Sequence, residues 1–146
     1  MIDFSIRNAD GAPSGLYMSL LPGVYRKHES CGGMIVVGEG AFGFLEPSIA
    51  KVSAEYSRPY SHWGVTALRR EEWALVLVEW GALETSLTGG ASDRVAGLRF
   101  ITRDLENEFL QEADLNYIRL ADFIREISLW LLTTLENHDV VSVLGI

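Results

Sequence analysis

Histidine and cysteine are the side chains that most readily bind metals or act as nucleophiles, and this chain has few of them. It contains one cysteine and three histidines in 146 residues. His28 and Cys31 lie three residues apart, and His62 is the next candidate ligand along the chain. A zinc site needs three or four such ligands, so even a three-ligand site would use nearly the whole supply. We therefore expect no metal ion and no cofactor.

A nucleophilic triad is the other chemistry that these residues suggest. Cys31, His62 and Asp139 could be combined in this way, but Cys31 lies in a glycine-rich turn without the local signature of a catalytic cysteine. His138 follows the predicted last helix, where a positive charge interacts favourably with the helix dipole. No Walker loop, nucleophile elbow or HExxH motif is present. The sequence therefore predicts a protein that is not an enzyme.

Glycine spacing gives a further candidate, because Gly38–Gly43 fits the pattern GxGxxG after an apolar run. In a dinucleotide site this pattern opens a helix whose N-terminus faces the phosphates. Here Glu39 would repel a pyrophosphate, and two phenylalanines and a proline follow where a βαβ unit should continue. We expect a hairpin turn instead. The alternative is a ligand pocket at Gly38–Phe44, lined by Glu39, His28 and His62.

Carboxylates outnumber every other charged group and are concentrated in one segment. The chain has 20 acidic and 12 basic residues, which gives a formal net charge of −8. This charge argues against nucleic acid or a membrane as partner, because both repel a negative surface. Five acidic residues and no basic residue lie between positions 104 and 114: Asp104, Glu106, Glu108, Glu112 and Asp114. We interpret this segment either as a solvated face or as a negative surface that binds a cationic groove on another protein.

The loop Tyr56–Trp63 is the second candidate for binding a partner. It contains Tyr56, Arg58, Tyr60 and Trp63, and tyrosine, tryptophan and arginine are the residue types most enriched in interface hot spots. We predict that Tyr56, Arg58 and Tyr60 contact a partner. Trp63 is expected to begin a strand and to be buried.

A helix over residues 71–87 is the element around which the chain is expected to fold. Trp73 and Trp80 lie on its apolar face, and its flanks are apolar as well. The remaining polar stripe is thin: Glu72, Glu79 and Ser86. Because a helix that is apolar around most of its circumference belongs inside a domain, we expect other elements to cover it on more than one side.

The other elements follow from hydrophobic periodicity and turn residues. Strands are predicted at Ile2–Ile6, Leu16–Leu21, Met34–Val37, Ala41–Leu45, just before residue 71, and at Val140–Leu144. Helices are predicted at Glu46–Tyr56, from Val95 to Phe109, and at Tyr117–Asn137 with Asn116 as its cap. A short strand within residues 95–102 is the alternative to the first part of the third helix.

These elements predict one globular domain over residues 1–146. The expected class is α+β, with a small sheet packed against a helical layer centred on the helix 71–87, and a mostly helical fold is the alternative. The N-terminus lacks the apolar run of a signal peptide, and the longest apolar stretches are too short to span a bilayer. A single cysteine suits a reducing compartment. We therefore expect a cytoplasmic protein.

Two stretches resemble the small immunity proteins of bacterial contact-dependent growth inhibition and related polymorphic-toxin systems. They are the pattern HWGV…EEW…VEW…L within Ser61–Leu87 and the ending RLADFIREISLWLLTTLENHDVVSVLGI. The resemblance covers about the C-terminal half. It implies a cytoplasmic, non-catalytic protein that binds a cognate toxin domain and covers the active site of the toxin. Such toxins are frequently nucleases with a basic groove, which an acidic surface is suited to fill.

Two other functions are also compatible with the sequence. One is a small-ligand-binding or enzymatic α+β domain. The other is an adaptor subunit that associates with itself through apolar surface on the last helix, at Phe123 and Trp130.

Overall fold

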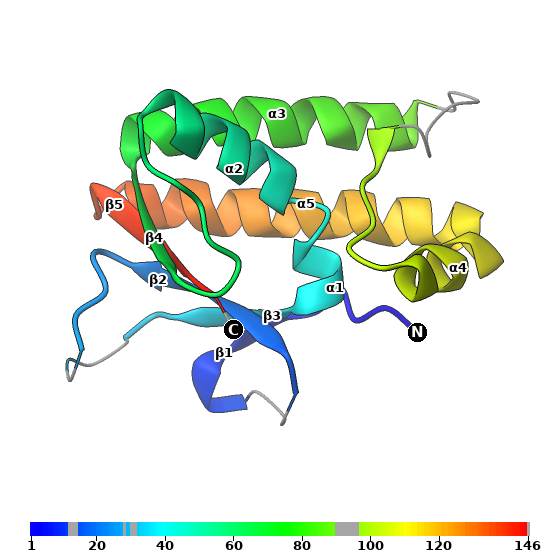
Figure 1. Cartoon of the computed structure of the whole chain (residues 1–146), viewed down its shortest axis with the longest axis horizontal. Coiled ribbons are helices and arrows are strands. Elements are labelled where there is room, and N and C mark those ends of the chain that lie inside the picture. Colours follow the sequence, from blue (N-terminus) through cyan, green and yellow to red (C-terminus); the bar gives the residue numbers. More distant parts are fainter. Residues whose placement is uncertain (12–14, 28, 30–31, 90–96, 146) are drawn as a thin grey trace.

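A five-stranded antiparallel sheet packed against two long helices organises the part of the chain that the structure describes (Figure 1). This computed structural model describes residues 1–11, 15–27, 29, 32–89 and 97–145. The strands are β1 (Ile6–Asn8), β2 (Tyr17–Pro22), β3 (Ile35–Gly38), β4 (Val65–Arg69) and β5 (Val140–Leu144). The helices are α1 (Glu39–Phe42), α2 (Glu46–Glu55), α3 (Arg70–Thr88), α4 (Arg103–Gln111) and α5 (Ala113–Leu135), with a 3-10 turn at Ala9–Gly11. The α+β class is therefore confirmed.

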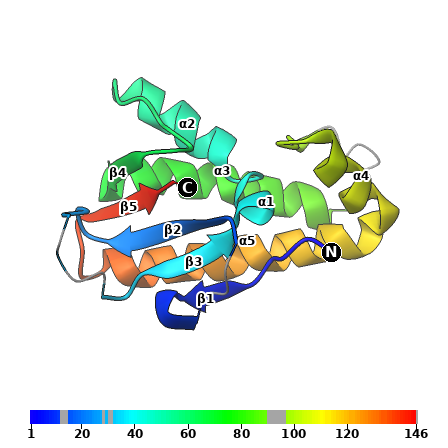
Figure 2. The ribbon, with the colours of Figure 1, turned by 60° about the horizontal axis from the view of Figure 1, so that its bottom comes forward.

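The sheet joins the two ends of the chain. Its strand order is β1-β3-β2-β5-β4, so the C-terminal strand lies between β2 and β4 (Figure 2). Leu20 of β2 pairs with Ile35 on one side and with Val143 on the other, and Leu68 of β4 pairs with Val141. All five side chains are buried. Inward-facing residues of neighbouring strands thus form one continuous apolar surface.

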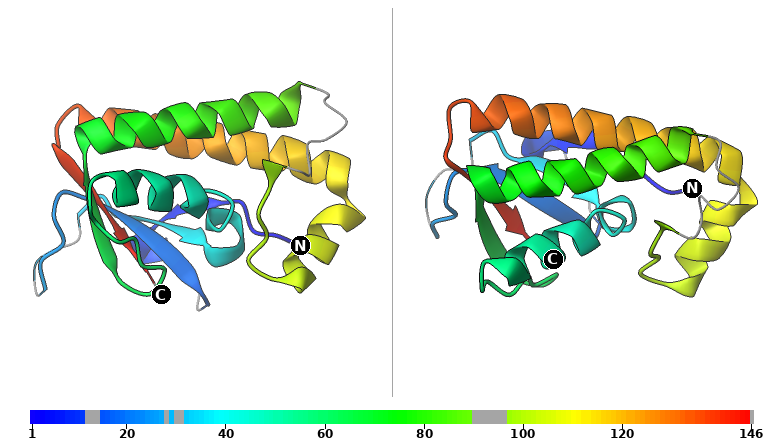
Figure 3. Two further views of the ribbon diagram at one scale, coloured as in Figure 1. Left: turned by 45° about the horizontal axis from the view of Figure 1, so that its top comes forward. Right: turned by 90° about the horizontal axis from the view of Figure 1, so that it is seen from above.

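The two long helices lie side by side and cover this surface (Figure 3). They run antiparallel, because the Arg70 guanidinium at the start of α3 donates to the Leu135 carbonyl at the end of α5. Trp73 and Trp80 of α3 are fully buried, with ring centroids 6.0 Å apart. Each indole N–H donates to a backbone carbonyl, of Val141 and Leu45 respectively, so burial leaves neither polar group unsatisfied. The predicted core position of both tryptophans is confirmed.

The flanks of α3 differ from the prediction. Glu72, assigned to a solvent-facing polar stripe, is fully buried; its carboxylate accepts from the Arg69 backbone and lies 3.1 Å from the Arg58 guanidinium. Val78, assigned to a covered apolar flank, is 73% exposed. The expectation of cover on more than one side is confirmed, because α5, α2 and β4 all contact α3, but the flank at Val78 is open to solvent. The helix is rotated so that its polar stripe faces α2, where Glu79 pairs with Lys51.

Several predicted strands are confirmed within a residue or two, namely β2, β3, β4 and β5. The first strand begins later than expected, at Ile6 in place of Ile2. The Asp3 carboxylate accepts hydrogen bonds from the backbone and the hydroxyl of Ser5. This local turn holds the chain out of the ladder until Ile6, which pairs with Val37.

The predicted hairpin arm at Ala41–Leu45 is wrong. The chain leaves β3 at Gly38 and enters α1 directly, with the Gly43 N–H donating to the Glu39 carbonyl. A second turn leads into α2, where Leu45 precedes the first helical residue. Phe42, Phe44 and Leu45 are buried, so a compact helical corner places three apolar side chains in the core where an extended arm would place alternate ones outside.

The third predicted helix corresponds to α4. It begins at Arg103, eight residues after the predicted start. Thr102 adopts an extended backbone, and its hydroxyl accepts from the Leu105 N–H, which makes it the N-cap. Residues 97–102 lie in neither the predicted helix nor the alternative strand. Positions 95 and 96 lie outside the described residues.

The last helix begins at Ala113, upstream of the predicted cap. Asn116 is a buried residue inside α5, and its side-chain amide donates to the Phe109 carbonyl at 2.9 Å. It therefore satisfies a carbonyl at the end of α4, in place of capping its own helix. Phe123 is 1% exposed and so offers almost no surface to a second copy, whereas Trp130 is only half-buried against the core.

Candidate functional site

A group of polar side chains lines part of an apolar pocket of about 610 Å³. Three separate parts of the chain line it: the α1–α2 corner, the loop before β4, and the segment before α4. The apolar lining residues are Pro47, Ala50, Trp63, Phe100 and Ile101, and the polar ones include Glu39, Glu46, Tyr60, His62 and Arg99. A concave, mostly apolar surface with a few converging polar groups is the usual form of a binding site.

The two carboxylates of this site are the first residues of two helices. Glu39 opens α1 immediately after β3, and Glu46 opens α2. Free backbone N–H groups at a helix start favour a negative charge there. Only 8% of Glu46 is exposed, so its carboxylate depends on hydrogen-bond donors within the protein in place of water. The corner between α1 and α2 thus directs both carboxylates toward the loop that precedes β4.

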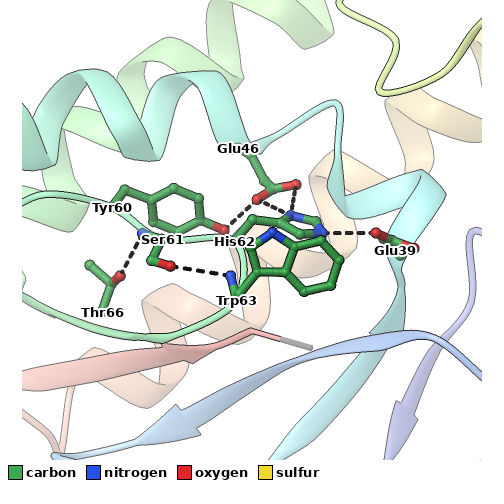
Figure 4. Close-up of polar contacts among 7 residues, drawn as sticks. All are labelled: Glu39, Glu46, Tyr60, Ser61, His62, Trp63 and Thr66. Atoms are coloured by element: carbon green, nitrogen blue, oxygen red, sulfur yellow. Dashed lines mark hydrogen bonds and ion pairs between the residues drawn. The ribbon is translucent and has the colours of Figure 1, made fainter.

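His62 lies between these carboxylates (Figure 4). Its Nε2 is 2.8 Å from Glu39 Oε1, and its Nδ1 is 2.7 Å from Glu46 Oε2. Ionised carboxylates only accept hydrogen bonds, so both ring nitrogens must donate, and this requires the imidazolium form. Burial alone would lower the pKa of His62, but the hydrogen bonds and negative charges of Glu46 and Glu39 outweigh it and raise the pKa above its ordinary value. The arrangement is a carboxylate–imidazolium–carboxylate bridge, which we call the His62 bridge.

Tyr60 completes the His62 bridge from the same loop. Its hydroxyl donates to Glu46 Oε2 at 2.5 Å (Figure 4). Burial and the adjacent Glu46 carboxylate raise the pKa of Tyr60, because an ionised phenolate there would be desolvated and repelled. Tyr60 therefore remains a donor, and Glu46 receives hydrogen bonds from two residues of one loop.

Further contacts fix the loop on both sides of this site. The Arg58 guanidinium donates to the Ala67 carbonyl at 3.0 Å and also pairs with Glu72. The Ser61 hydroxyl accepts from the Trp63 N–H, and the Gly64 N–H donates to the Ser61 carbonyl. Residues 58–64 are thereby tied to α1, α2, α3 and β4.

The glycine pattern at 38–43 has a packing explanation. A Cβ on Gly43 would lie 2.9 Å from the Ile101 side chain, and one on Gly40 would lie 3.3 Å from the Leu105 side chain. These two glycines let Ile101 and the first turn of α4 approach α1 closely, and Ile101 forms part of the pocket wall. The expectation of no dinucleotide motif remains a prediction, since the glycines account for packing without excluding a ligand.

The aromatic loop is arranged differently from the prediction. Trp63, expected to be buried, is 70% exposed. It precedes the first residue of β4 by two positions and lies in the Ser61–Gly64 turn, which directs its indole outward. Tyr56 is 43% exposed and available to a partner. Arg58 and Tyr60 are held by the internal contacts given above, so they support the loop; direct contact with a partner remains a prediction for them.

The predicted acidic residues surround α4 and the start of α5. Asp104, Glu112 and Asp114 are exposed, while Glu106 and Glu108 are half-exposed. Glu108 forms an ion pair with the N-terminal ammonium. Within the part of the chain that the structure describes, none of the other four carboxylates forms an ion pair. The structure thus places these five acids on the outside of one helical corner.

The predicted site residues are only partly brought together. Glu39 and His62, named for a ligand pocket, do line one, but His28 and Cys31 lie outside the described residues. Asp139 pairs with Arg70 and is not joined to His62. Among the described residues, no group of three histidine, cysteine, aspartate or glutamate side chains is arranged to hold a metal ion.

Glu46 and the apolar wall at Phe100–Ile101 were not predicted. Glu46 stands directly before Pro47 at a predicted helix start, and this position was a usable signal for a carboxylate at a helix N-terminus. No local pattern marks Phe100 and Ile101, because the segment has no regular structure. Their role depends on contact with residues about 40 to 60 positions away.

No helix within the described residues is long and apolar enough to cross a membrane. No protein-family model, no curated protein and no solved structure matches the chain.

Proposed function

We propose that this protein is a cytoplasmic immunity protein that binds a cognate bacterial toxin domain and covers its active site. The observation that carries the proposal is the acidic corner formed by α4 and the start of α5. The resemblance of Ser61–Leu87 and of the C-terminal segment to immunity proteins of contact-dependent inhibition systems supports it independently. The net charge of −8 fits a basic partner.

The acidic corner has the features of a surface for electrostatic association. Asp104, Glu108 and Glu112 follow one another at four-residue spacing and line one hollow beside the N-terminus. Among the described residues, the cationic groups that line this hollow are the N-terminal ammonium and Arg119. Within the described residues Asp104 and Glu112 form no ion pair, and such exposed carboxylates attract a positively charged groove over about a Debye length, roughly 10 Å at 0.1 M salt. Such charges raise the association rate and select the partner.

The His62 bridge supports binding over catalysis. A general acid or base must present a titratable atom to the substrate. Both nitrogens of His62 are engaged by carboxylates of the same chain, and the Tyr60 hydroxyl is engaged by Glu46. The groups with the chemistry for proton transfer are therefore used to hold the loop in place. We propose that the protein has no enzymatic activity.

A second candidate function is a small-ligand-binding domain. The pocket of about 610 Å³ favours it, since ligand sites in proteins commonly measure about 300–1,000 Å³. A small molecule that co-purifies with the protein and is lost on Ile101→Asp substitution would support this function. A protein that purifies without a bound small molecule and still protects cells from the toxin would support the immunity function.

The experiment that tests the proposal is co-expression with the toxin domain encoded beside this protein. We expect protected cells and a stable complex on size-exclusion chromatography. Replacing Asp104, Glu108 and Glu112 by Asn, Gln and Gln should slow association and reduce its dependence on salt, because three attractive charges are removed. Cells that remain unprotected, with no complex in the purified mixture, would refute the proposal.

A matched control separates this local charge from the total charge. Glu55, Glu71 and Glu136 are three exposed carboxylates outside the acidic corner. Their replacement by Gln changes the net charge by the same amount. The association rate of this variant should stay close to that of the unmodified protein. An equal loss in both variants would show that net charge, and not the acidic corner, governs the encounter.

A further inference from the structure

Trp63 is a large apolar side chain that the fold holds in solvent beside a hollow. It is 70% exposed, and its ring packs edge-on against His62 with centroids 4.9 Å apart. Figure 4 shows the indole in front of the His62 bridge. When a partner covers an exposed tryptophan at the edge of a pocket, a large apolar surface is removed from water. Tryptophan is accordingly enriched among interface hot spots.

The pocket beside Trp63 is lined mainly by apolar groups. Pro47 and Ala50 of α2 line one part, and Phe100 and Ile101 line another. Its charged lining groups are two carboxylates, Glu39 and Glu46, against the His62 imidazolium and the Arg99 guanidinium. With His62 as the imidazolium, the carboxylates and cations of the lining are equal in number. Its apolar walls are complementary to an apolar side chain.

Shared lining residues connect this pocket with the acidic corner. Ile101 and Thr102 lead directly into α4, where the first carboxylate is Asp104. Glu39 also lines a neighbouring hollow together with Leu105 and Glu108. A partner that lies against α4 and α1 would therefore meet carboxylates on one side and the Trp63 pocket on the other.

The loop that carries Trp63 is fixed before any partner arrives. His62 is held by Glu39 and Glu46, and Tyr60 is held by Glu46. The Gly145 N–H donates to the Gly64 carbonyl at 2.7 Å, immediately after Trp63. A surface that is ordered in the free protein loses less conformational entropy on binding. Trp63 is thus presented in a preorganised position.

We propose that Trp63 and its pocket are the anchor of the toxin-binding face, and that the pocket takes up an apolar side chain from the basic surface of the toxin domain. This inference rests on the proposed function and assigns the two parts of the face different tasks. The carboxylates of α4 steer the encounter, and the Trp63 pocket holds the complex. Trp63 therefore controls the dissociation rate, whereas the acidic corner controls the association rate.

The test measures both rates for the purified protein and its cognate toxin domain by surface plasmon resonance. Trp63→Ala should weaken binding by roughly thirtyfold, the usual size of a hot-spot effect, almost entirely through faster dissociation. The loss should be nearly the same at low and high salt, because it does not arise from charge. Ala50→Trp, which fills the pocket and keeps Trp63, should weaken binding as well.

Leu129→Ala is the matched control. Leu129 of α5 is 64% exposed and does not line the pocket, so its loss should leave both rates unchanged. A complex that forms normally with Trp63→Ala and with Ala50→Trp would overturn the anchor while leaving the proposed function intact. Equal losses for Trp63→Ala and Leu129→Ala would also overturn it. If the unmodified protein forms no complex and gives no protection, the proposed function fails and the anchor fails with it.

Discussion

Gly145 lies against the backbone carbonyl of His62, and a Cβ at position 145 would overlap the oxygen of that carbonyl. The Gly145 N–H donates to Gly64 on the other side of Trp63. The last residues of the described chain therefore hold the turn that carries both His62 and Trp63. This contact links the C-terminal strand β5 to the candidate site, although the two are separated by about 80 positions in sequence.

Gly145→Ala should destabilise the protein, because the added methyl group displaces the turn at His62. We expect a loss of about 1–3 kcal/mol, the usual cost of overpacking, measured by urea denaturation. Gly81→Ala is the matched control, since a Cβ on Gly81 of α3 meets no atom within 4 Å. That substitution should be neutral or should stabilise the helix by up to about 1 kcal/mol. Equal effects of both substitutions would contradict the close approach at residue 145.

The ionisation of His62 should make stability depend on pH. The folded-state pKa of His62 is raised by its two carboxylates, whereas the unfolded value is about 6.5. A raised pKa means that the folded state holds this proton more tightly than the unfolded state. The stabilising contribution is therefore complete below about pH 6.5. It is lost as the pH rises through the folded-state pKa.

Urea denaturation between pH 5.5 and pH 9 measures this dependence. The unfolding free energy should fall with rising pH in the unmodified protein, and the fall should be smaller in His62→Gln. His138→Gln, at an exposed histidine beyond α5, should keep the full dependence. A pH profile that is unchanged in His62→Gln would show that the bridge does not hold the proton.

The sequence predicts the elements well where the signal is local. Apolar spacing in α2, α3 and α5 is enough to identify those helices, because a helix repeats its pattern within a few residues. The same spacing does not say which flank of α3 another element covers. Glu72 is polar yet buried, since Arg58 neutralises it from a loop 14 residues earlier. Val78 is apolar yet exposed, since none of the described elements packs on that side.

The candidate site is harder to predict because it is assembled from distant segments. Glu39 belongs to helix α1, His62 to a turn and Ile101 to an irregular segment. No sequence period relates the three residues. Trp63 shows the limit most clearly. Its neighbours suggest a buried strand, but β4 begins two residues later. Because successive residues of a strand face opposite sides, adding or removing one residue in the turn changes whether the indole faces the core or the solvent.

The two kinds of tryptophan should respond differently to truncation. Trp80→Ala removes a fully buried ring and leaves the Leu45 carbonyl without its donor, so we expect a loss of about 3–5 kcal/mol. Trp63→Ala removes an exposed ring and should change stability by less than about 0.5 kcal/mol. Differential scanning calorimetry of both variants checks this. A similar loss in the two proteins would mean that Trp63 belongs to the core and is not available as an anchor.

Asn116 should prove important for the corner that carries the acidic residues. Its amide is buried and donates to the Phe109 carbonyl near the end of α4, while its own backbone N–H donates to the carbonyl of Glu112, the residue before α5. Asn116→Ala leaves the Phe109 carbonyl without this donor, and an unsatisfied buried acceptor costs about 1–3 kcal/mol.

Asn137→Ala, at an exposed position after α5, should be nearly neutral and serves as control. Urea denaturation gives the two free energies, and amide hydrogen exchange across residues 103–116 locates the effect. Faster exchange confined to α4 and the first turn of α5 is expected, because that amide joins the end of one helix to the start of the next. Uniform acceleration across the sheet as well would show that Asn116 supports the whole core, and the acidic corner would then not be an independently held part of the binding face.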